Sequence, residues 1–270
     1  MVLTFIVPVR HPDNAPDWKT LISRLRQTLR SIAAQTCDDW EAVVVANHGV
    51  ELPTLPDRVV VERVDFPPNR MFDLNVAGRE AAYDAVREDK GKRILAGMRT
   101  RPDSRYFMVV DDDDFVSNRL VAFVRDNAGE AGWTFNQGYI WSENRPVVYK
   151  YDDFSKLCGT SHIVRSDLFE QLREASATEL DFIKRCLGSH IFIEADLREA
   201  GTPLRPLPFR GAVYRVGHRG AHSRSSGVLR SYILRRDVLR NPRRLLQRIR
   251  RLRLVSKRHR REFFGSAATV

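Results

Sequence analysis

The nine residues 106–114, YFMVVDDDD, decide how this sequence is interpreted. The first five are apolar and rich in β-forming side chains, which predicts a short buried strand. The four aspartates would then lie together where that strand leaves its sheet, and their mutual repulsion calls for a cation or hydrogen-bond donors. Oxygen ligands of this kind suit Mg²⁺ or Mn²⁺, which bridge carboxylates to substrate phosphates. A solvated acidic turn or an acidic helix start remains the alternative.

Length and composition indicate a soluble globular protein. The 270 residues suffice for one large domain or two small ones, 43% of them are hydrophobic, and no apolar run approaches a membrane span. The first ten residues, MVLTFIVPVR, have no basic leader or cleavage site, so we interpret them as a strand and not a signal peptide. Three irregularly spaced cysteines, Cys37, Cys158 and Cys186, indicate buried thiols in a reducing compartment and hence a cytoplasmic protein.

The net charge of +11 comes from the C-terminal end. Residues 224–262 hold 15 of the 45 lysines and arginines and 2 of the 34 acidic residues, so the rest of the chain is nearly neutral. Such a basic tail attracts polyanions, for example an anionic membrane surface, nucleic acid or an acidic polymer.

Strand and helix patterns alternate along the first half, which predicts an α/β domain with a mostly parallel sheet flanked by helices. Ligands of such sheets bind beyond the carboxyl ends of the strands. Strands are expected at 3–9, 40–46, 58–64, 106–110 and 211–216, and helices at 18–34, 77–88, 118–126, 166–172, 179–186 and 191–199.

Residues 132–151 are rich in aromatic side chains and predict a small sheet. Aromatic rings can fill a core or form a platform for the apolar faces of sugars, and the sequence leaves both open.

Six short sequence motifs occur in the order typical of another protein group: the chain resembles the GT-A-fold nucleotide-sugar glycosyltransferases, particularly the family 2 enzymes of bacterial polysaccharide synthesis. The resemblance covers roughly residues 3–223. The motifs are FIVP at 5–8, SIAAQT at 31–36, DWE at 39–41, DDDD at 111–114, GSH at 188–190 and YRVGH at 214–218.

This resemblance implies a GT-A (Rossmann-like) domain over residues 1–223, with a nucleotide-binding half at 1–117 and an acceptor half at 118–223. It also implies transfer of a sugar, with inversion, from a nucleoside diphosphate sugar, UDP- or dTDP-linked, to a hydroxyl of a cell-surface glycan or lipid-linked acceptor. The expected cofactor is Mn²⁺ or Mg²⁺. Residues 224–270 would form a basic amphipathic helical tail outside the domain.

The resemblance also assigns roles to the aspartates. Asp113 would bind the metal between the diphosphate oxygens, and Asp111 would contact the nucleotide ribose or the metal through water. Asp112 belongs to the same nucleotide-sugar-binding group, and Asp114 would touch the sugar or support the turn. His218 matches a family histidine that completes the metal or diphosphate site, or is a surface-loop residue.

Further contacts with the nucleotide-sugar donor are expected from the end of the first strand and from basic residues that precede the strand at 106–110. Pro8 and Arg10 would border the base pocket. One of Lys92, Arg93 and Arg99 would reach a phosphate, unless these side chains only form solvated helix faces.

Two departures from the family pattern affect the site. Asn47 follows the strand expected at 40–46, at a position where the family has an aspartate that contacts the nucleotide base. The amide of an asparagine can still form hydrogen bonds with a base edge. The family's acidic pair, which supplies the general base, is replaced by Ser189-His190. A histidine can remove the proton of the acceptor hydroxyl, so His190 is the expected base.

Other interpretations of this region stay open. In these, His190 is instead a second metal ligand or a helix cap, and Glu179, Asp181 and Glu194 are the alternative catalytic carboxylates.

In the tail, apolar residues of 228–262 recur at helical spacing between arginines, a pattern typical of a helix lying on an anionic membrane surface. We therefore expect a peripheral protein at the inner face of the cell membrane. A helical appendage packed on the domain is the alternative. Nucleic acid is an unlikely partner, because the basic stretch has few aromatics and no nucleic-acid motif.

Two other functions compete with glycosyl transfer. A sugar nucleotidyltransferase also pairs aspartates with an α/β sheet, but it would need a glycine-rich basic loop after the first strand, and residues 11–16, HPDNAP, contain no glycine. A non-catalytic protein that binds polyanions or membranes through its tail is the third possibility.

Overall fold

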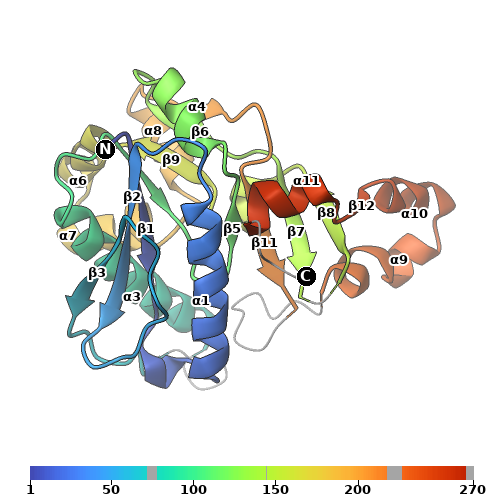
Figure 1. Ribbon diagram of the computed structural model, residues 1–270, viewed down its shortest axis with the longest axis horizontal. Helices are drawn as coiled ribbons and strands as arrows, with labels where there is room; N and C mark the ends of the chain where they lie inside the picture. Colours follow the sequence, from blue (N-terminus) through green and yellow to red (C-terminus); the bar gives the residue numbers. More distant parts are fainter. Residues whose placement is uncertain (72–77, 144, 218–226, 266–270) are drawn as a thin grey trace.

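A seven-stranded, mostly parallel sheet forms the centre of the molecule (Figure 1). The structure is a computed structural model that describes residues 1–71, 78–143, 145–217 and 227–265. Only β9 runs antiparallel to its neighbours, so the expected α/β fold class is confirmed. The strand order is β10 (Arg205–Pro206), β6 (Gly132–Thr134), β9 (His162–Arg165), β4 (Tyr106–Val109), β1 (Leu3–Pro8), β2 (Trp40–Asn47) and β3 (Val59–Val64).

The register of the parallel strands places the aspartates beside the end of β1. Ile6 of β1 lies opposite Val109 of β4, and the amide of Val110 donates to the carbonyl of Ile6. Because both strands run the same way, Pro8 and Asp111 leave the sheet at neighbouring points of its carboxyl edge.

Helices cover both faces of this sheet, as strands buried on both sides require. Helix α1 (Trp18–Ala33), capped by the Asp17 side chain, packs Leu25 and Leu29 into one core with Phe5 of β1. On the other face, α3 (Arg79–Arg99) packs Ile94 with Ile6. Alternate residues of β1 thus enter different cores.

Helix α3 is longer than the sequence predicts. The helix expected at 77–88 continues through the following residues as one helix that ends at Arg99. Gly91 weakens the local helix signal, but it is needed for packing: a Cβ there would lie 2.1 Å from the carbonyl oxygen of Ile183.

The remaining elements of the domain are short. The predicted helices of the second half are present, and the one expected at 179–186 is a short α-helix followed by a π-helical turn. Those four predicted helices correspond to α4 (Leu120–Asp126), α6 (Ser166–Ala175), α7 (Glu179–Asp181) with η2 (Phe182–Leu187), and α8 (Ile193–Glu199). Two further short elements, η1 (Pro12–Asn14) and α5 (Phe154–Leu157), are not predicted by the sequence.

A second, five-stranded sheet accounts for most of the aromatic stretch at 132–151. Trp141 and Tyr149 are buried in it, and Trp133 is buried in β6 of the main sheet. These three rings therefore fill cores. The strand order is β12 (Leu252–Leu254), β8 (Val147–Tyr151), β7 (Gly138–Ser142), β11 (Ala212–Val216) and β5 (Phe115–Val116).

The C-terminal extension is helical but is not one continuous amphipathic helix. Asn241-Pro242 starts a new helix, and residues 252–254 pair with β8 instead of continuing it. Phe263 and Phe264 pack against residues of the five-stranded sheet, so the chain returns to the domain, whereas α9 and α10 project from it (Figure 1). The elements are η3 (Leu229–Ile233), α9 (Arg236–Leu239), α10 (Pro242–Ile249), β12, α11 (Lys257–His259) and η4 (Arg260–Phe264).

Among the described residues, every helix is too short or too polar to cross a bilayer.

Candidate functional site

A cavity of about 470 Å³ opens at the carboxyl edge of the main sheet. Its volume lies within the usual range of small-molecule sites. It is lined by residues from seven parts of the chain: Pro8, Arg10 and Asn14 at and after the end of β1; Asn69; Tyr83, Val86, Arg87, Asp89, Lys90 and Arg93 of α3; Asp111, Asp112 and Asp113; Leu157 and Gly159; Gly188, Ser189, His190 and Ile191; and Tyr214 and Arg215 of β11.

The four aspartates divide between the cavity and the interior. Asp111, Asp112 and Asp113 line the cavity, whereas Asp114 is fully buried and accepts hydrogen bonds from Thr160 Oγ1 at 2.7 Å and from the amide of Arg215 at 3.1 Å. Burial raises the pKa of Asp114 well above its usual value. Asp114 therefore ties the turn to β11, and it is not among the residues that line the cavity.

Asp112 is the least satisfied of the cavity carboxylates. Its side chain is buried, its Oδ2 has no hydrogen-bond partner among the described residues, and its nearest cation is Arg10, with Nη2 3.7 Å from Oδ1. Burial raises the pKa of Asp112 to about 6. A donor or cation entering the cavity would relieve this unpaired oxygen.

The basic wall of the cavity comes from one face of α3. Lys90 Nζ lies 2.5 Å from Asp111 Oδ1, and Arg93, which is 1% exposed, binds Asp89. Of the three cations that the sequence singled out, Arg93 reaches the cavity. Lys92 pairs with Glu88 and the exposed Arg99 with Glu179, and neither lines it.

Lys90 and Arg87 line the cavity without having been singled out from the sequence. They stand three residues apart from each other, and Lys90 stands three from Arg93, which is the spacing of a single helix face. A predicted helix that extended to Arg99 would have placed these three cations on one helix face.

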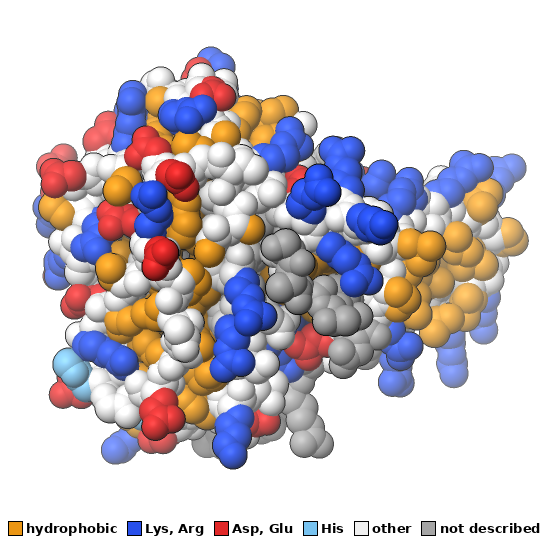
Figure 2. Space-filling model, in the orientation of Figure 1, with side chains coloured by type: hydrophobic (Ala, Val, Ile, Leu, Met, Phe, Trp, Pro, Cys, Tyr) orange, Lys and Arg blue, Asp and Glu red, His pale blue; other side chains and the backbone are white. Residues whose placement is uncertain are grey.

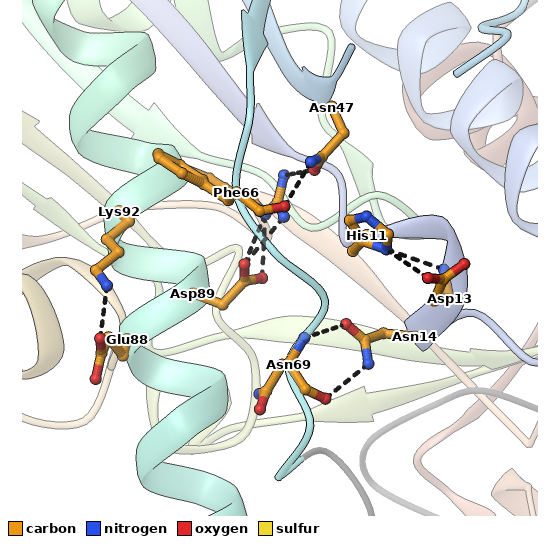
Figure 3. A network of polar contacts seen from close by, with 10 residues as sticks. His11, Asp13, Asn14, Asn47, Phe66, Asn69, Glu88, Asp89 and Lys92 are labelled. Carbon is orange, nitrogen blue, oxygen red and sulfur yellow. Dashed lines mark hydrogen bonds and ion pairs between the residues drawn. The ribbon is translucent and has the colours of Figure 1, made fainter. Parts of the chain in front are cut away.

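Asn47 is committed to contacts inside the protein. Its Oδ1 accepts from Arg93 at 2.8 Å and its Nδ2 donates to the carbonyl of Phe66 at 2.6 Å (Figure 3). Asn47 is buried and is not among the residues lining the cavity, so the base contact considered for it stays a prediction without support from this geometry.

Two other asparagines lie at the cavity wall. Asn14 Nδ2 donates to the carbonyl of Asn69, and the amide of Asn69 donates back to Asn14 Oδ1, at 2.9 and 2.8 Å (Figure 3). Nδ2 of Asn69 is buried without a partner among the described residues. An unpaired amide donor at this wall suits an acceptor atom such as a base carbonyl.

His190 lines the cavity, on a segment that packs against α3. Gly188 allows this close approach, because a Cβ there would lie 1.9 Å from the carbonyl oxygen of Arg87. Burial, followed by the charge of Lys90, lowers the pKa of His190 to about 4, so the imidazole is neutral at pH 7. Its Nε2 has no partner among the described residues, and a 30 Å³ hollow separates it from His162, whose Nε2 is likewise unpaired.

The alternative catalytic carboxylates lie elsewhere. Asp181 bonds to Thr178 and borders a different cavity, and Glu194 bonds to Thr134 and Arg198; neither lines the aspartate cavity. His218 falls outside the described residues.

Two of the cavity aspartates suit a divalent metal. Asp111 and Asp113 both face the cavity, but the described residues contain no group of three carboxylate, histidine or cysteine ligands. A hard cation that takes most of its ligands from a diphosphate and from water fits such a sparse carboxylate set, as Mg²⁺ does in phosphate-transfer sites. The donor set thus fits a metal that arrives with its nucleotide.

A buried ion network supports the floor of the cavity. The Arg215 side chain is 0% exposed and lies over Phe115, 4.6 Å from the ring centroid. It donates to Glu143 at 2.7 Å, and Glu143 also accepts two hydrogen bonds from Arg24. Burial acts to raise the pKa of Glu143, but the two arginines prevail and lower it to about 2.

Glu143→Gln is expected to lower the free energy of unfolding by roughly 2–3 kcal/mol, since it leaves two largely buried arginines without their counter-charge. The loss should vanish in acid: the contribution of Glu143 is complete above about pH 4.5 and disappears as pH falls toward 2. Urea denaturation at several pH values measures this. Glu130→Gln, which breaks the exposed pair with Arg205, is the control and should change stability by less than about 1 kcal/mol. Equal effects of the two variants would contradict a buried network.

Comparison with known proteins gives only a likeness of fold. No protein-family model and no curated protein matches the chain. The crystal structure of S. aureus TarS residues 1–349 is similar, with a TM-score of 0.47 and 13% identity, over 80% of this chain and 60% of that one. The structure of Rv0371c from Mycobacterium tuberculosis in complex with manganese has a TM-score of 0.35 and 12% identity, over 79% and 91%. The chain thus spans about three fifths of the TarS structure.

Proposed function

We propose that this protein is a metal-dependent glycosyltransferase that moves a sugar from a nucleoside diphosphate sugar to a hydroxyl of a glycan or lipid-linked acceptor. One observation carries the proposal: three aspartates, a row of cations on α3 and a neutral histidine meet in one cavity at the carboxyl edge of a parallel sheet. Sugar transfer from a diphosphate needs these three components, namely metal ligands, phosphate-binding cations and a base.

The nucleotide is assigned to the part of the cavity between β1 and α3. Pro8, Arg10, Asn14 and Asn69 line the cavity, and we assign the two asparagines to polar atoms of the base. The donor is expected to be UDP- or dTDP-linked, since a pyrimidine offers carbonyl oxygens to the Asn69 amide, which has no partner in the part of the chain that the structure describes.

Asp113 and Asp111 are assigned to Mn²⁺ or Mg²⁺, which would neutralise charge on the departing diphosphate. Arg87 and Arg93 of α3 also line the cavity and are assigned to add positive charge near the phosphates. Asp112 stands next to Arg10 at the same rim and is assigned to orienting the donor.

His190 is assigned as the group that takes the proton of the acceptor hydroxyl. With a pKa lowered to about 4 it is already deprotonated at neutral pH, as a base must be before it acts. Its Nε2 is buried and unpaired among the described residues, so an acceptor hydroxyl that reaches it would meet no competing hydrogen bond. In-line attack from this side would invert the anomeric centre, which NMR of the product would show.

Two other functions receive less support from this geometry. A sugar nucleotidyltransferase grips a triphosphate with a loop after the first strand, and here that stretch is the short turn η1 with no buried residues. A non-catalytic polyanion-binding protein gives no reason for three aspartates in a cavity. Calorimetric titration of UDP with and without Mn²⁺ separates these, since a scaffold should show no metal-dependent nucleotide binding.

We also assign the projecting part of the extension to an anionic membrane surface. Figure 2 shows apolar side chains gathered on the arm formed by α9 and α10, bordered by lysines and arginines. Leu239, Leu246 and Ile249 are each about half exposed there, while Val228, Ile233 and Val238 are buried against the domain. Apolar side chains within a cationic border match the headgroup region of an acidic bilayer. This would hold the enzyme at the inner face of the membrane, near lipid-linked acceptors.

Leu246→Ser/Ile249→Ser is expected to weaken binding to vesicles containing acidic lipid by about tenfold or more, because each exposed side chain would bury its apolar surface in the bilayer. Co-sedimentation at moderate salt measures this. Leu180→Ser, which removes an equally exposed leucine from α7, is the control and should bind as wild type. If wild-type protein ignores acidic vesicles, the membrane assignment is wrong.

A further inference from the structure

Lys90 occupies the place at Asp111 that a metal ion would take. Its Nζ lies 2.5 Å from Asp111 Oδ1, within the same cavity. The two side chains are 23% and 29% exposed, so the pair is shielded from water on most sides but open toward the cavity. A lysine this close to a carboxylate acts as its counter-ion.

The surroundings of this pair are shaped to hold it. A Cβ at Gly159 would lie 2.8 Å from Asp111 Oδ2 and 2.9 Å from Lys90 Nζ, so glycine leaves room for both groups. The amide of Asp111 is fixed by Thr160 Oγ1 at 3.0 Å. Burial acts to lower the pKa of Lys90, but the charge of Asp111 prevails and raises it, so the ammonium stays protonated.

The same carboxylate is one of the two assigned to the metal. Lys90 occupies Oδ1 of this carboxylate, and a divalent cation binding to the same oxygen would lie close to a second positive charge, which is strongly unfavourable in a partly buried site. Metal binding at Oδ1 therefore requires Lys90 to move away from it. Its flexible four-carbon stem allows this, and the open side of the pair is the cavity in which the diphosphate would lie.

We propose that Lys90 is a placeholder cation: it neutralises Asp111 in the free enzyme, yields that carboxylate to the metal, and then binds the diphosphate of the donor. This inference rests on the proposed function and adds a residue that the sequence did not indicate. It predicts that Lys90 opposes binding of the metal alone and favours binding of the metal with its nucleotide.

Lys90→Met tests the two opposite effects, because methionine keeps most of the length of the side chain and removes its charge. Mn²⁺ alone, measured by the loss of the free-ion EPR signal, should bind the variant about tenfold more tightly than wild type. UDP, titrated by calorimetry at saturating Mn²⁺, should bind it about tenfold more weakly, as expected for the loss of one charge-assisted contact.

Lys92→Met is the matched control, since Lys92 lies on the same helix, pairs with Glu88 and does not line the cavity; Figure 3 shows that pair. It should leave both affinities unchanged. Lys90→Gln gives a second charge-free variant if Lys90→Met fails to fold, and thermal melts verify folding. Weaker or unchanged Mn²⁺ binding in folded Lys90 variants would overturn the placeholder role. If wild-type protein binds neither Mn²⁺ nor UDP, the proposed function itself fails.

Discussion

Asp113→Asn is expected to reduce metal-dependent turnover of the sugar donor by about a hundredfold or more, since the loss of a metal ligand removes several kcal/mol of transition-state stabilisation. Affinity for Mn²⁺ should fall in parallel. Donor hydrolysis followed across a Mn²⁺ concentration series measures both. The effect follows from the position of Asp113, which lines the cavity in the turn that follows β4, the strand paired with β1.

Asp114→Asn is the contrasting variant, because the neighbouring carboxylate points inward to Thr160 and to the amide of Arg215. It should cost roughly 1–3 kcal/mol of stability, the price of a disrupted buried hydrogen-bond site, while Mn²⁺ affinity changes little. A folded Asp113→Asn enzyme with full metal-dependent activity would show that the metal is assigned to the wrong residue.

His190→Ala is expected to lower the rate of sugar transfer by about 10²–10⁴-fold, the usual contribution of a positioned base. Affinity for UDP with Mn²⁺ should stay within about threefold of wild type, because the base acts on the acceptor. Single-turnover assays with saturating donor separate the two quantities. With the pKa of His190 near 4, the acid limb of the wild-type rate profile should lie near pH 4, well below the usual titration range of a histidine.

Asp181→Asn and Glu194→Gln are the matched controls for that prediction. Both carboxylates lie outside the aspartate cavity and hold local contacts, with Thr178 and with Thr134. Each variant should transfer sugar at nearly the wild-type rate. Near-full turnover in His190→Ala together with a large loss in either carboxylate variant would move the base to that carboxylate.

The sequence predicts the parts of this site that depend on local patterns. Strands β1, β2, β3 and β4 are short apolar runs, and their alternation with helices implies a shared carboxyl edge. The aspartates after β4 and the Pro8 end of β1 could be placed on this basis alone.

What the sequence does not predict depends on contacts between distant segments. The helix face that carries Lys90 is not predicted, because Gly91 interrupts the helical pattern of the sequence. Glycine is needed at that position because the backbone of Ile183, a residue distant in sequence, packs against it. Asn47 ends the expected strand, yet its amide is taken by Arg93 and Phe66, from two later elements. Likewise, apolar residues recur at helical spacing throughout the tail, but the pairing of β12 with β8 interrupts the helical structure there.

The most direct test of the account is a screen of nucleotide sugars for Mn²⁺-stimulated sugar release by the wild-type protein, run beside Asp113→Asn. We expect one donor, UDP- or dTDP-linked, to be hydrolysed slowly with Mn²⁺, and this activity to disappear with EDTA and in the variant. No release from any donor, together with no nucleotide binding in the presence of Mn²⁺, would contradict the claim that the aspartate cavity binds an activated sugar.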